Sequence, residues 1–158
     1  DTGTEIPEGN SPLIEVADAE ALVDEILTEG NEITVVNFWA TWCGPCRIEF
    51  PELMAYDAEM EGTGVEVRFV SVDDEEVLPL VRTFLDEQGL TERSFISVGN
   101  TMLAGQFDPR WGISLPTTLI LDADGIVRGG HQQMISKDQL EDLVAGVRDG
   151  SIDATTQL

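Results

Sequence analysis

The chain of 158 residues contains 42% hydrophobic and 6% aromatic residues, which is typical of a single soluble domain with its own core. Its 31 acidic and 8 basic residues give a net charge of −23, which argues against binding to nucleic acid or to an anionic membrane surface. The acidity predicts either an ordinary solvated surface or adaptation to high salt, where dense carboxylates stay hydrated.

The predicted elements follow from the apolar patterns. Residues 1–12 are polar and rich in Gly and Pro, so we expect a flexible tail, a linker or the remnant of a removed signal or anchor segment. The apolar, β-branched run at 33–40 predicts a strand buried on both faces. The other expected elements are a strand at 13–16, helices at 18–30 and from 46 onward, a strand at 65–72, a helix at 75–88, a short strand at 94–98, a short helix with a loop at 100–113, a hairpin of 117–121 and 126–128, and a helix after Ser136 that ends near Arg148.

This order predicts a mixed α/β sandwich. Strand–helix–strand units favour parallel pairing, and the tight hairpin adds an antiparallel edge. We expect one domain over residues 13–150 and a C-terminal tail over 151–158. The active site should lie at the carboxyl end of the strand that ends at Ala40.

Cys43 and Cys46 are the only cysteines, in the stretch FWATWCGPCRIEFPEL at 38–53. A bridge between them would close a very short loop and add little stability. The pair is therefore better explained by chemistry than by a structural role.

Three other roles for the cysteines fit poorly. Structural zinc needs four ligands, and the chain adds only His131 to the two thiols. Covalent haem attachment needs a histidine directly after the second cysteine, where Arg47 stands. A one-cysteine peroxidase has Pro and Thr seven and three residues before its cysteine, where this chain has Val36 and Ala40.

A redox role fits the local physics. Cys43 lies at a strand–helix junction, where backbone N–H groups and the helix dipole favour a thiolate. Gly44 allows the tight entry turn, and Pro45 suits a first helical turn that needs no N–H donor. Cys46 comes one turn later and is placed to resolve a mixed disulfide on Cys43.

The stretch FWATWCGPC resembles the thioredoxin superfamily, and the longer NFWATWCGPCRIEFPEL resembles its TlpA/ResA-like extracytoplasmic thiol–disulfide oxidoreductases. Asn37 stands where thioredoxin has a buried acid. In ISLPTTLILDADGIV, Pro116 matches the cis-proline that faces the cysteines. The resemblance implies a thioredoxin-like three-layer sandwich with a mixed central sheet, a redox-active Cys43–Cys46 disulfide, and no cofactor or metal. The run Cys-Arg/Lys-x-Glu-x-Pro of that branch is matched by Cys46, Arg47, Glu49 and Pro51.

Further site residues are expected around this motif. Trp42 is expected to cover the active-site rim or to be a packing aromatic. The backbone of Leu115 would offer an edge to an extended substrate, so the predicted substrate-binding residues are Trp42, Gly44, Pro45 and Leu115. The resemblance implies an acidic residue near the end of the second buried strand. Of Asp73 and Asp74 we choose Asp74 as the catalytic carboxylate, with helix capping as its alternative.

The expected function is reduction of disulfides in exported proteins, apocytochromes c among them, by a monomer outside the cytoplasm (periplasmic or membrane-anchored). A membrane or soluble thiol reductase would supply the electrons. The alternatives are a general cytoplasmic thioredoxin and a binding or chaperone-like module whose CxxC motif is vestigial.

Overall fold

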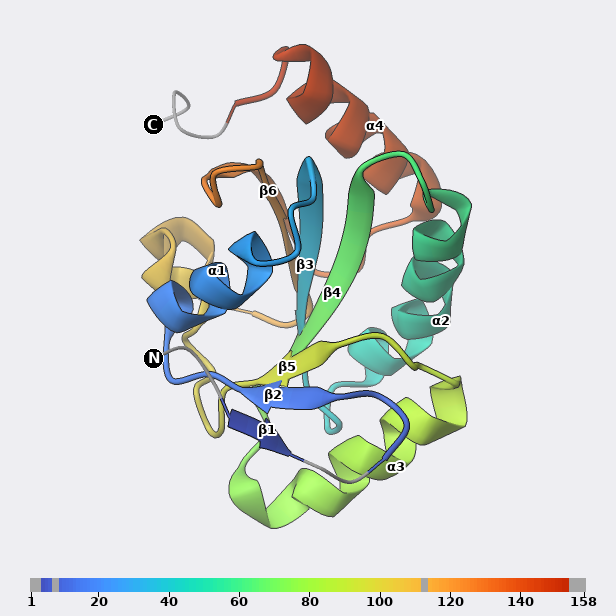
Figure 1. The fold of residues 1–158 in the computed structure, drawn as a ribbon, viewed down its shortest axis with the longest axis vertical. Coiled ribbons are helices and arrows are strands. Elements are labelled where there is room, and N and C mark those ends of the chain that lie inside the picture. Colours follow the sequence, from blue (N-terminus) through green and yellow to red (C-terminus); the bar gives the residue numbers. More distant parts are fainter. Residues whose placement is uncertain (1–3, 7–8, 112–113, 154–158) are drawn as a thin grey trace.

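The structure, a computed structural model, describes residues 4–6, 9–111 and 114–153. Within these residues, one mixed sheet has the strand order β1-β2-β5-β4-β3-β6-β7 (Figure 1). Its strands are β1 (Thr4–Ile6), β2 (Leu13–Glu15), β3 (Ile33–Trp39), β4 (Val65–Ser71), β5 (Ser94–Ile96), β6 (Thr117–Leu121) and β7 (Val127–Gln132).

The central strand β3 is buried along its whole length, as its apolar run predicts. It pairs in parallel with β4 on one side and antiparallel with β6 on the other. β4, β5 and β2 continue the parallel array, and β7 closes the antiparallel hairpin with β6. Asn37 is a polar exception within this strand, so it needs hydrogen-bond partners inside the protein.

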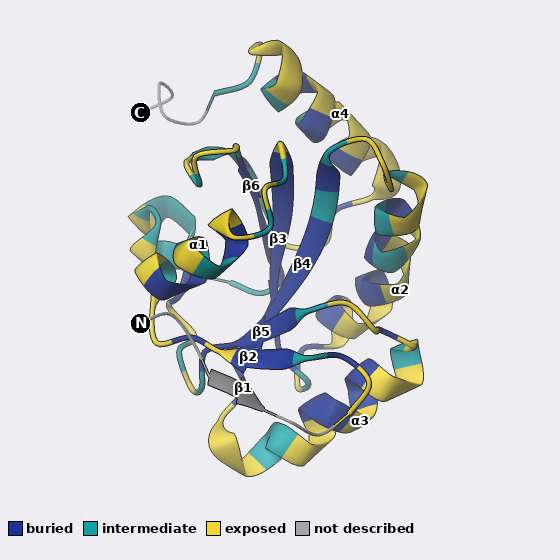
Figure 2. Cartoon of the chain, in the orientation of Figure 1, coloured by how far each residue is buried: buried dark blue, intermediate teal, exposed yellow. Residues whose placement is uncertain are grey.

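Helices cover both faces of the sheet, so the protein is a three-layer α/β sandwich of the predicted class. On one face, Phe38 of β3 contacts Phe107, and the neighbouring Gln106 accepts the N–H of Ala19 at the start of α1. On the other face, Trp39 contacts Phe50 of α2 and Phe84 of α3. Figure 2 shows that the strands between the helices are buried along most of their length. The helices are α1 (Ala19–Leu27), α2 (Gly44–Glu59), α3 (Leu78–Gln88) and α4 (Lys137–Asp149), with short 3₁₀ helices η1 (Glu75–Val77), η2 (Ala104–Gln106) and η3 (Pro109–Trp111).

The N-terminal segment differs from the expected tail over residues 1–12. Thr4–Ile6 form β1, which pairs antiparallel with β2. Ser11 is buried; its hydroxyl donates to the carbonyl of Glu92, and its own carbonyl accepts from Arg82 of α3. The polar composition does not reveal this strand, because backbone hydrogen bonds hold it at the edge of the sheet.

The chain after α4 also packs on the domain where a tail is expected. The N–H of Ile152 donates to the carbonyl of Gly146 at 2.9 Å, and Asp153 pairs with Arg128. Residues 154–158 of the expected tail lie outside the described residues.

Two other elements differ from their predicted bounds. The helix expected over 75–88 is divided into η1 and α3, since Pro79 lies in the first turn of α3, where no N–H donor is required. The second strand of the hairpin runs to Gln132 rather than ending at 128, and so carries the chain back to the end of the sheet where the cysteines lie.

Candidate active site

The two cysteines lie where β3 passes into α2. Cys43 is the N-cap residue of α2 and forms a disulfide with Cys46, with a Cα–Cα distance of 5.3 Å. The backbone N–H of Cys46 points at Sγ of Cys43 across 3.3 Å. Cys43 is 6% exposed and Cys46 is 0% exposed. After reduction, the helix N-terminus would therefore stabilise a thiolate on Cys43, while Cys46 stays shielded.

The residues that flank Cys43 are open to solvent. Trp42 is 64% exposed, and Gly44 and Pro45 are exposed as well. Pro45 lies in the first turn of α2, where its lack of an N–H costs nothing. An exposed tryptophan beside the disulfide offers apolar contact area to another chain.

The segment before β6 lies at the same end of the sheet. The peptide bond between Leu115 and Pro116 is cis, with Pro116 buried and Leu115 half-buried. The next residue, Thr117, pairs with Phe38 near the end of β3, so the segment lies beside the strand that leads to the cysteines. The carbonyl of Pro116 accepts the N–H of Gln133 at 2.7 Å.

The two aspartates after β4 have opposite surroundings. Asp74 is exposed, and its side chain makes no capping hydrogen bond to η1. Asp73 is buried, and its carboxylate accepts from the N–H and hydroxyl of Thr41 and from the hydroxyl of Ser71. Thr41 directly precedes Trp42. It is therefore Asp73 rather than Asp74 whose hydrogen bonds hold the backbone that leads into the cysteine motif.

A second buried carboxylate, Glu49, lies on the inner face of α2. It is 1% exposed and follows Cys46 by three residues, which places both on one side of the helix. Its Oε1 accepts from Nδ2 of Asn37 at 2.9 Å, and its Oε2 accepts from the N–H of Ile135 at 3.0 Å. Nδ2 of Asn37 also donates to Oγ1 of Thr118 at 3.1 Å. We call these four residues, Asn37, Glu49, Thr118 and Ile135, the Glu49 cluster.

The surroundings of Glu49 change its acidity. Burial raises the pKa of this carboxyl above its ordinary value of 4.5, against the opposing effects of the hydrogen bonds from Ile135 and Asn37. The nearby charge of Glu52 raises the pKa further. A buried carboxyl with a raised pKa, one helical turn from a cysteine, is suited to exchange a proton with a thiol. In the sequence, Glu49 stands out only as part of the family motif; its spacing of three residues from Cys46 is the signal that places it on the same side of the helix.

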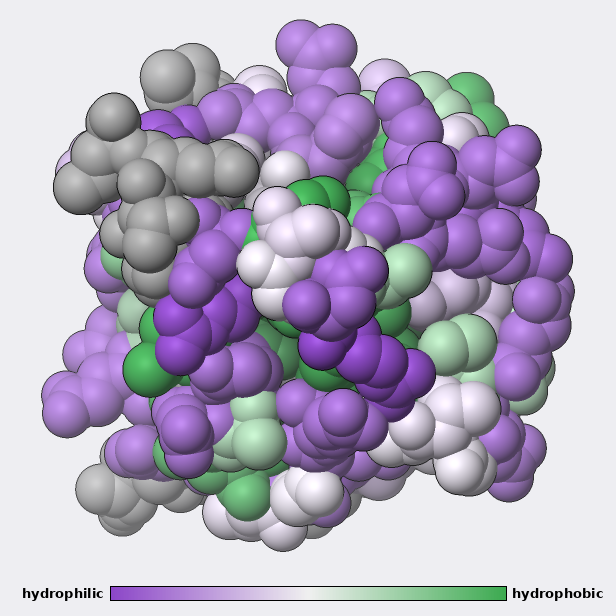
Figure 3. Space-filling view, turned by 90° about the horizontal axis from the view of Figure 1, so that it is seen from above, coloured by the Kyte–Doolittle hydropathy of each residue, from purple (hydrophilic) through white to green (hydrophobic). Residues whose placement is uncertain are grey.

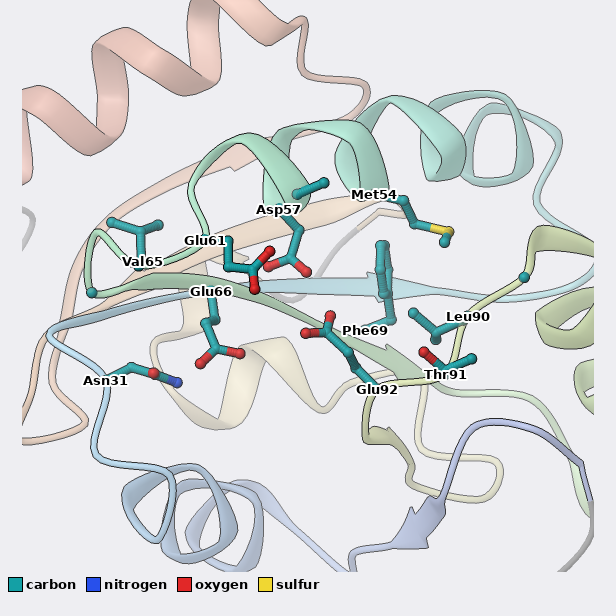
Figure 4. Close-up of a pocket in the computed structure, with 14 residues that line it drawn as sticks. Asn31, Met54, Asp57, Glu61, Val65, Glu66, Phe69, Leu90, Thr91 and Glu92 are labelled. Atoms are coloured by element: carbon teal, nitrogen blue, oxygen red, sulfur yellow. The ribbon is translucent and has the colours of Figure 1, made fainter.

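A groove of about 630 Å³ lies away from the cysteines, against the second half of α2, the start of β4 and the α3–β5 loop (Figure 4). Both acidic and apolar side chains line this groove. Glu92 hydrogen-bonds to the carboxyl of Asp57, which together with burial raises its pKa to about 7. The acidic lining residues are Asp57, Glu61, Glu66 and Glu92, and the apolar ones include Met54, Phe69 and Leu90. None of the lining residues belongs to the cysteine motif.

In the part of the chain that the structure describes, no group of three or more His, Cys, Asp or Glu side chains is arranged to hold a metal ion. None of the described helices is long and apolar enough to cross a membrane.

The mixed sheet, the CxxC disulfide at the start of the helix after the central strand, and the cis-proline at the same end define a thioredoxin-like protein. The family model described as AhpC/TSA family matches residues 11–129. The thiol-disulfide oxidoreductase ResA of Oceanobacillus iheyensis is 34% identical over 114 residues, which cover 72% of this chain and 55% of that protein. ResA of Bacillus thuringiensis is 30% identical over 135 residues, covering 83% of this chain and 72% of its relative. The chain belongs to the AhpC/TSA family and, within it, to the ResA-type thiol–disulfide oxidoreductases.

A solved structure supports the fold independently. The secreted thiol-disulfide isomerase from Corynebacterium glutamicum superposes with a TM-score of 0.65 at 21% identity, covering 78% of this chain and 75% of that one. The predicted family resemblance and the predicted fold class are thus confirmed.

Proposed function

We propose that this chain reduces disulfides of exported proteins outside the cytoplasm through the Cys43/Cys46 couple. The observation that carries the proposal is the disulfide at the N-terminus of α2, with the N–H of Cys46 directed at the sulfur of Cys43. This geometry favours a thiolate on the outer cysteine and keeps the inner one shielded, which a two-step exchange requires.

The proposed reaction begins with the reduced protein. The Cys43 thiolate attacks one sulfur of the substrate disulfide, forms a mixed disulfide and releases the other substrate sulfur as a thiolate. Cys46, deprotonated, then attacks Sγ of Cys43, forms the intramolecular disulfide and releases the second substrate thiolate. Two electrons have passed to the substrate, and the protein is left in the oxidised form that the structure holds. A thiol reductase must return two electrons to restart the cycle.

Other residues of the site have supporting roles in this proposal. Trp42, Gly44, Pro45 and the backbone of Leu115 contact the substrate segment, and Pro116 shapes the loop beside the cysteines. Glu49, rather than the predicted Asp74, is the proton-exchanging carboxylate in this proposal, since Glu49 is buried on the same face of α2 as Cys46. Asp73 holds Thr41 and hence the entry to the motif.

The extracytoplasmic location is supported by the relatives. The Corynebacterium glutamicum protein of the same fold is a secreted one, and the relatives at 30% identity or more include ResA proteins, YneN of Bacillus subtilis and a DsbE homologue of Paracoccus denitrificans. Apocytochromes c are the substrates to test first, because a surface with a net charge of −23 would attract basic proteins by electrostatic steering. We expect the protein to act as a monomer.

Insulin reduction tests the proposal directly. The reduced protein should accelerate the precipitation of insulin by dithiothreitol, and Cys46→Ser should accumulate a mixed disulfide with an apocytochrome c peptide, whereas Cys43→Ser should accumulate none. If the wild-type protein leaves insulin reduction unchanged, the motif is not a working couple, and a binding or chaperone-like role takes precedence. Efficient turnover with a cytoplasmic thioredoxin reductase would instead favour the cytoplasmic alternative.

A further inference from the structure

The amide of Asn37 has one buried atom without a partner at the centre of the Glu49 cluster. Its Nδ2 donates to Glu49 and to Thr118, whereas its Oδ1 is buried and accepts no hydrogen bond from the described residues. An unsatisfied buried acceptor carries a desolvation cost, so such groups are rare in native proteins. Oδ1 is therefore an atom of the cluster that can still gain a donor in another state of the site.

The observed arrangement fits an ionised Glu49. A carboxylate can only accept, so Oε1 requires the N–H side of the Asn37 amide and Oε2 takes the N–H of Ile135. The reversed amide would place the carbonyl oxygen of Asn37 against a negatively charged oxygen.

Protonation of Glu49 reverses this requirement. The carboxyl gains one O–H donor, and in the described part of the cluster the buried acceptor that lacks a donor is Oδ1 of Asn37. The N–H of Ile135 already occupies the Oε2 side, so a proton on Oε1 would face Nδ2, donor against donor. Turning the amide by a half rotation brings Oδ1 to the new O–H, and the hydroxyl of Thr118 can rotate to donate to the same oxygen. The NH₂ group then takes the buried position that Oδ1 had, so the rotation is favoured by the two new hydrogen bonds and by removal of the donor–donor contact, not by satisfying every polar atom of the amide.

We propose that Asn37 is a positioning residue whose side-chain amide turns over each time Glu49 takes up or releases a proton. The inference rests on the proposed function, in which Glu49 exchanges a proton with the thiols. When Cys46 is deprotonated for the resolving attack, its S–H bond breaks and an O–H bond forms on Glu49. No covalent bond of Asn37 changes. Its amide only turns, so that the carbonyl oxygen faces Glu49 in place of the NH₂ group.

The groups that hydrogen-bond to Glu49 or complete its cluster are uncharged, so few charged groups affect its protonation. β3, β6 and the β7–α4 loop contribute neutral groups to the cluster: the amide of Asn37, the hydroxyl of Thr118 and the backbone of Ile135. Along α2, the charge of Glu52 acts on it, and reduction adds the thiols of Cys43 and Cys46. His131 lies in β7, before the β7–α4 loop, where its ring nitrogen contacts the carbonyl of Met134.

Nuclear magnetic resonance on protein labelled with ¹⁵N in asparagine tests the proposal. The sequence has only four asparagines, and Asn37→Asp identifies the signal of Asn37. Between about pH 4 and pH 9, the Nδ2 protons should show a strong Overhauser effect to the Thr118 methyl group while Glu49 is ionised, and lose it as the ¹³C signal of the Glu49 carboxyl reports protonation. A contact that persists through this titration, or a Glu49 that does not titrate, overturns the proposal.

The variant Glu49→Gln imitates the protonated form of Glu49 at every pH. Its carboxamide oxygen would accept from Ile135, so its NH₂ group would face Asn37 and hold the amide turned at every pH. The Asn37 signals should then stay at their protonated-state positions. If they move with pH as in the wild type, Glu49 is not what turns the amide.

Asn37→Leu removes the amide and should raise the proton affinity of Glu49 by about tenfold, because the carboxylate loses a charge-assisted hydrogen bond. Asn31→Leu is the control, since Asn31 also donates to a glutamate, Glu29, outside the cluster, and it should leave the Glu49 titration unchanged. An equal shift in both variants, or none in Asn37→Leu, contradicts the proposal. These readouts follow Asn37 and Glu49 whether or not the protein reduces insulin, so they separate this inference from the proposed function.

Discussion

Cys43 and Cys46 have the same side chain, but the start of α2 places them in different surroundings. Cys43 caps the helix and receives an N–H from Cys46, whose own side chain is fully buried. The exposed neighbours, Trp42 and Pro45, leave approach open on the side of Cys43. The two thiols therefore differ in reactivity because of their positions at the start of α2, and not because of their side-chain structure.

This difference predicts an order of alkylation. In the reduced protein at neutral pH, iodoacetamide should modify Cys43 at least about tenfold faster than Cys46, because thiolate character and access both favour it. Peptide mapping after short exposures measures the two rates. Faster labelling of Cys46 would reverse the roles of nucleophile and resolving thiol.

Glu49→Gln should flatten part of the pH dependence of stability. The folded-state pKa of Glu49 is raised by burial, so its contribution to stability is fully present below its ordinary pKa of 4.5 and is lost as pH rises through the folded-state value. The wild type should therefore lose stability on the alkaline side of pH 4.5, and the variant should lose less. Urea unfolding at a series of pH values measures the free energy.

Asp74→Asn is the companion variant for Glu49→Gln. Because Asp74 is exposed, its replacement should leave both the stability profile and the pH profile of Cys43 alkylation close to those of the wild type. A larger change in alkylation for Asp74→Asn than for Glu49→Gln would restore the assignment made from the sequence.

The choice between these carboxylates shows where sequence reasoning reaches its limit. The cysteine roles are predicted from the local motif, because the start of a helix is a local feature, whereas the cis-proline is implied by the family resemblance. Which of Asp73 and Asp74 turns inward depends on the direction of one residue at the end of β4, and adjacent residues differ completely in burial there. The partners of Glu49 come from β3 and the β7–α4 loop, far apart in sequence, so its environment could not be derived from α2 alone.

At the scale of elements, long periodic segments were predicted well and edges were not. β3, β4 and α4 carry their own signals: continuous apolar runs and the capping box formed by Ser136 and Gln139. β1 carries no such signal, since it consists of three residues whose pairing with β2 depends on a tertiary contact. The division of η1 from α3 likewise reflects a proline in the first turn rather than a change of hydrophobic pattern.

The α3–β5 loop supports a second pH prediction. The hydrogen bond to Asp57 and burial raise the pKa of Glu92 to about 7. The protonated side chain therefore contributes to the stability of the fold below pH 4.5, and this contribution is lost as pH rises through about 7. The free energy of unfolding of Glu92→Gln should therefore fall less than that of the wild type when the pH rises from about 5 to 8. At the alkaline end, the variant should be more stable than the wild type by no more than about 1 kcal/mol, because the Glu92 side chain is 45% exposed and solvent screens its interaction with Asp57.

Urea unfolding at the two pH values measures this effect. Glu61→Gln, which removes one negative charge from the same groove, is the control for general charge repulsion. If both variants respond alike, the Asp57–Glu92 contact is not the source of the pH dependence.

At the scale of the whole molecule, negative charge dominates the surface. Six basic residues form ion pairs with carboxylates in the described structure: Arg68, Arg93, Arg110, Arg128, Lys137 and Arg148. With 31 acidic residues in the sequence, these pairs cannot neutralise the surface. Hydrophilic residues accordingly prevail on the face shown in Figure 3. Folding brings these like charges together, which costs free energy that dissolved salt can reduce.

The melting temperature should therefore rise with salt. Screening at about 0.15 M already shortens the Debye length to roughly 8 Å, so the Coulomb part of the gain should arrive early. A further rise toward molar concentration, larger in sodium sulfate than in sodium chloride, would indicate adaptation to high salt. A melting temperature that does not change in either salt from about 0.1 M upward would show that the acidity serves another purpose, such as attraction of basic partners.

The scarcity of basic residues has a practical consequence at α4. Lys137 is the one lysine of the sequence, and it opens α4 two residues after Ile135, with its ammonium group paired to Glu59. A dye that reacts with amines would find one lysine side chain, Lys137, besides the α-amino group of the chain, and would leave the cysteines untouched. A dye on Lys137 would lie beside the loop whose N–H groups donate to Pro116 and Glu49, so a change of its fluorescence on reduction would show that this loop responds to the state of the cysteines.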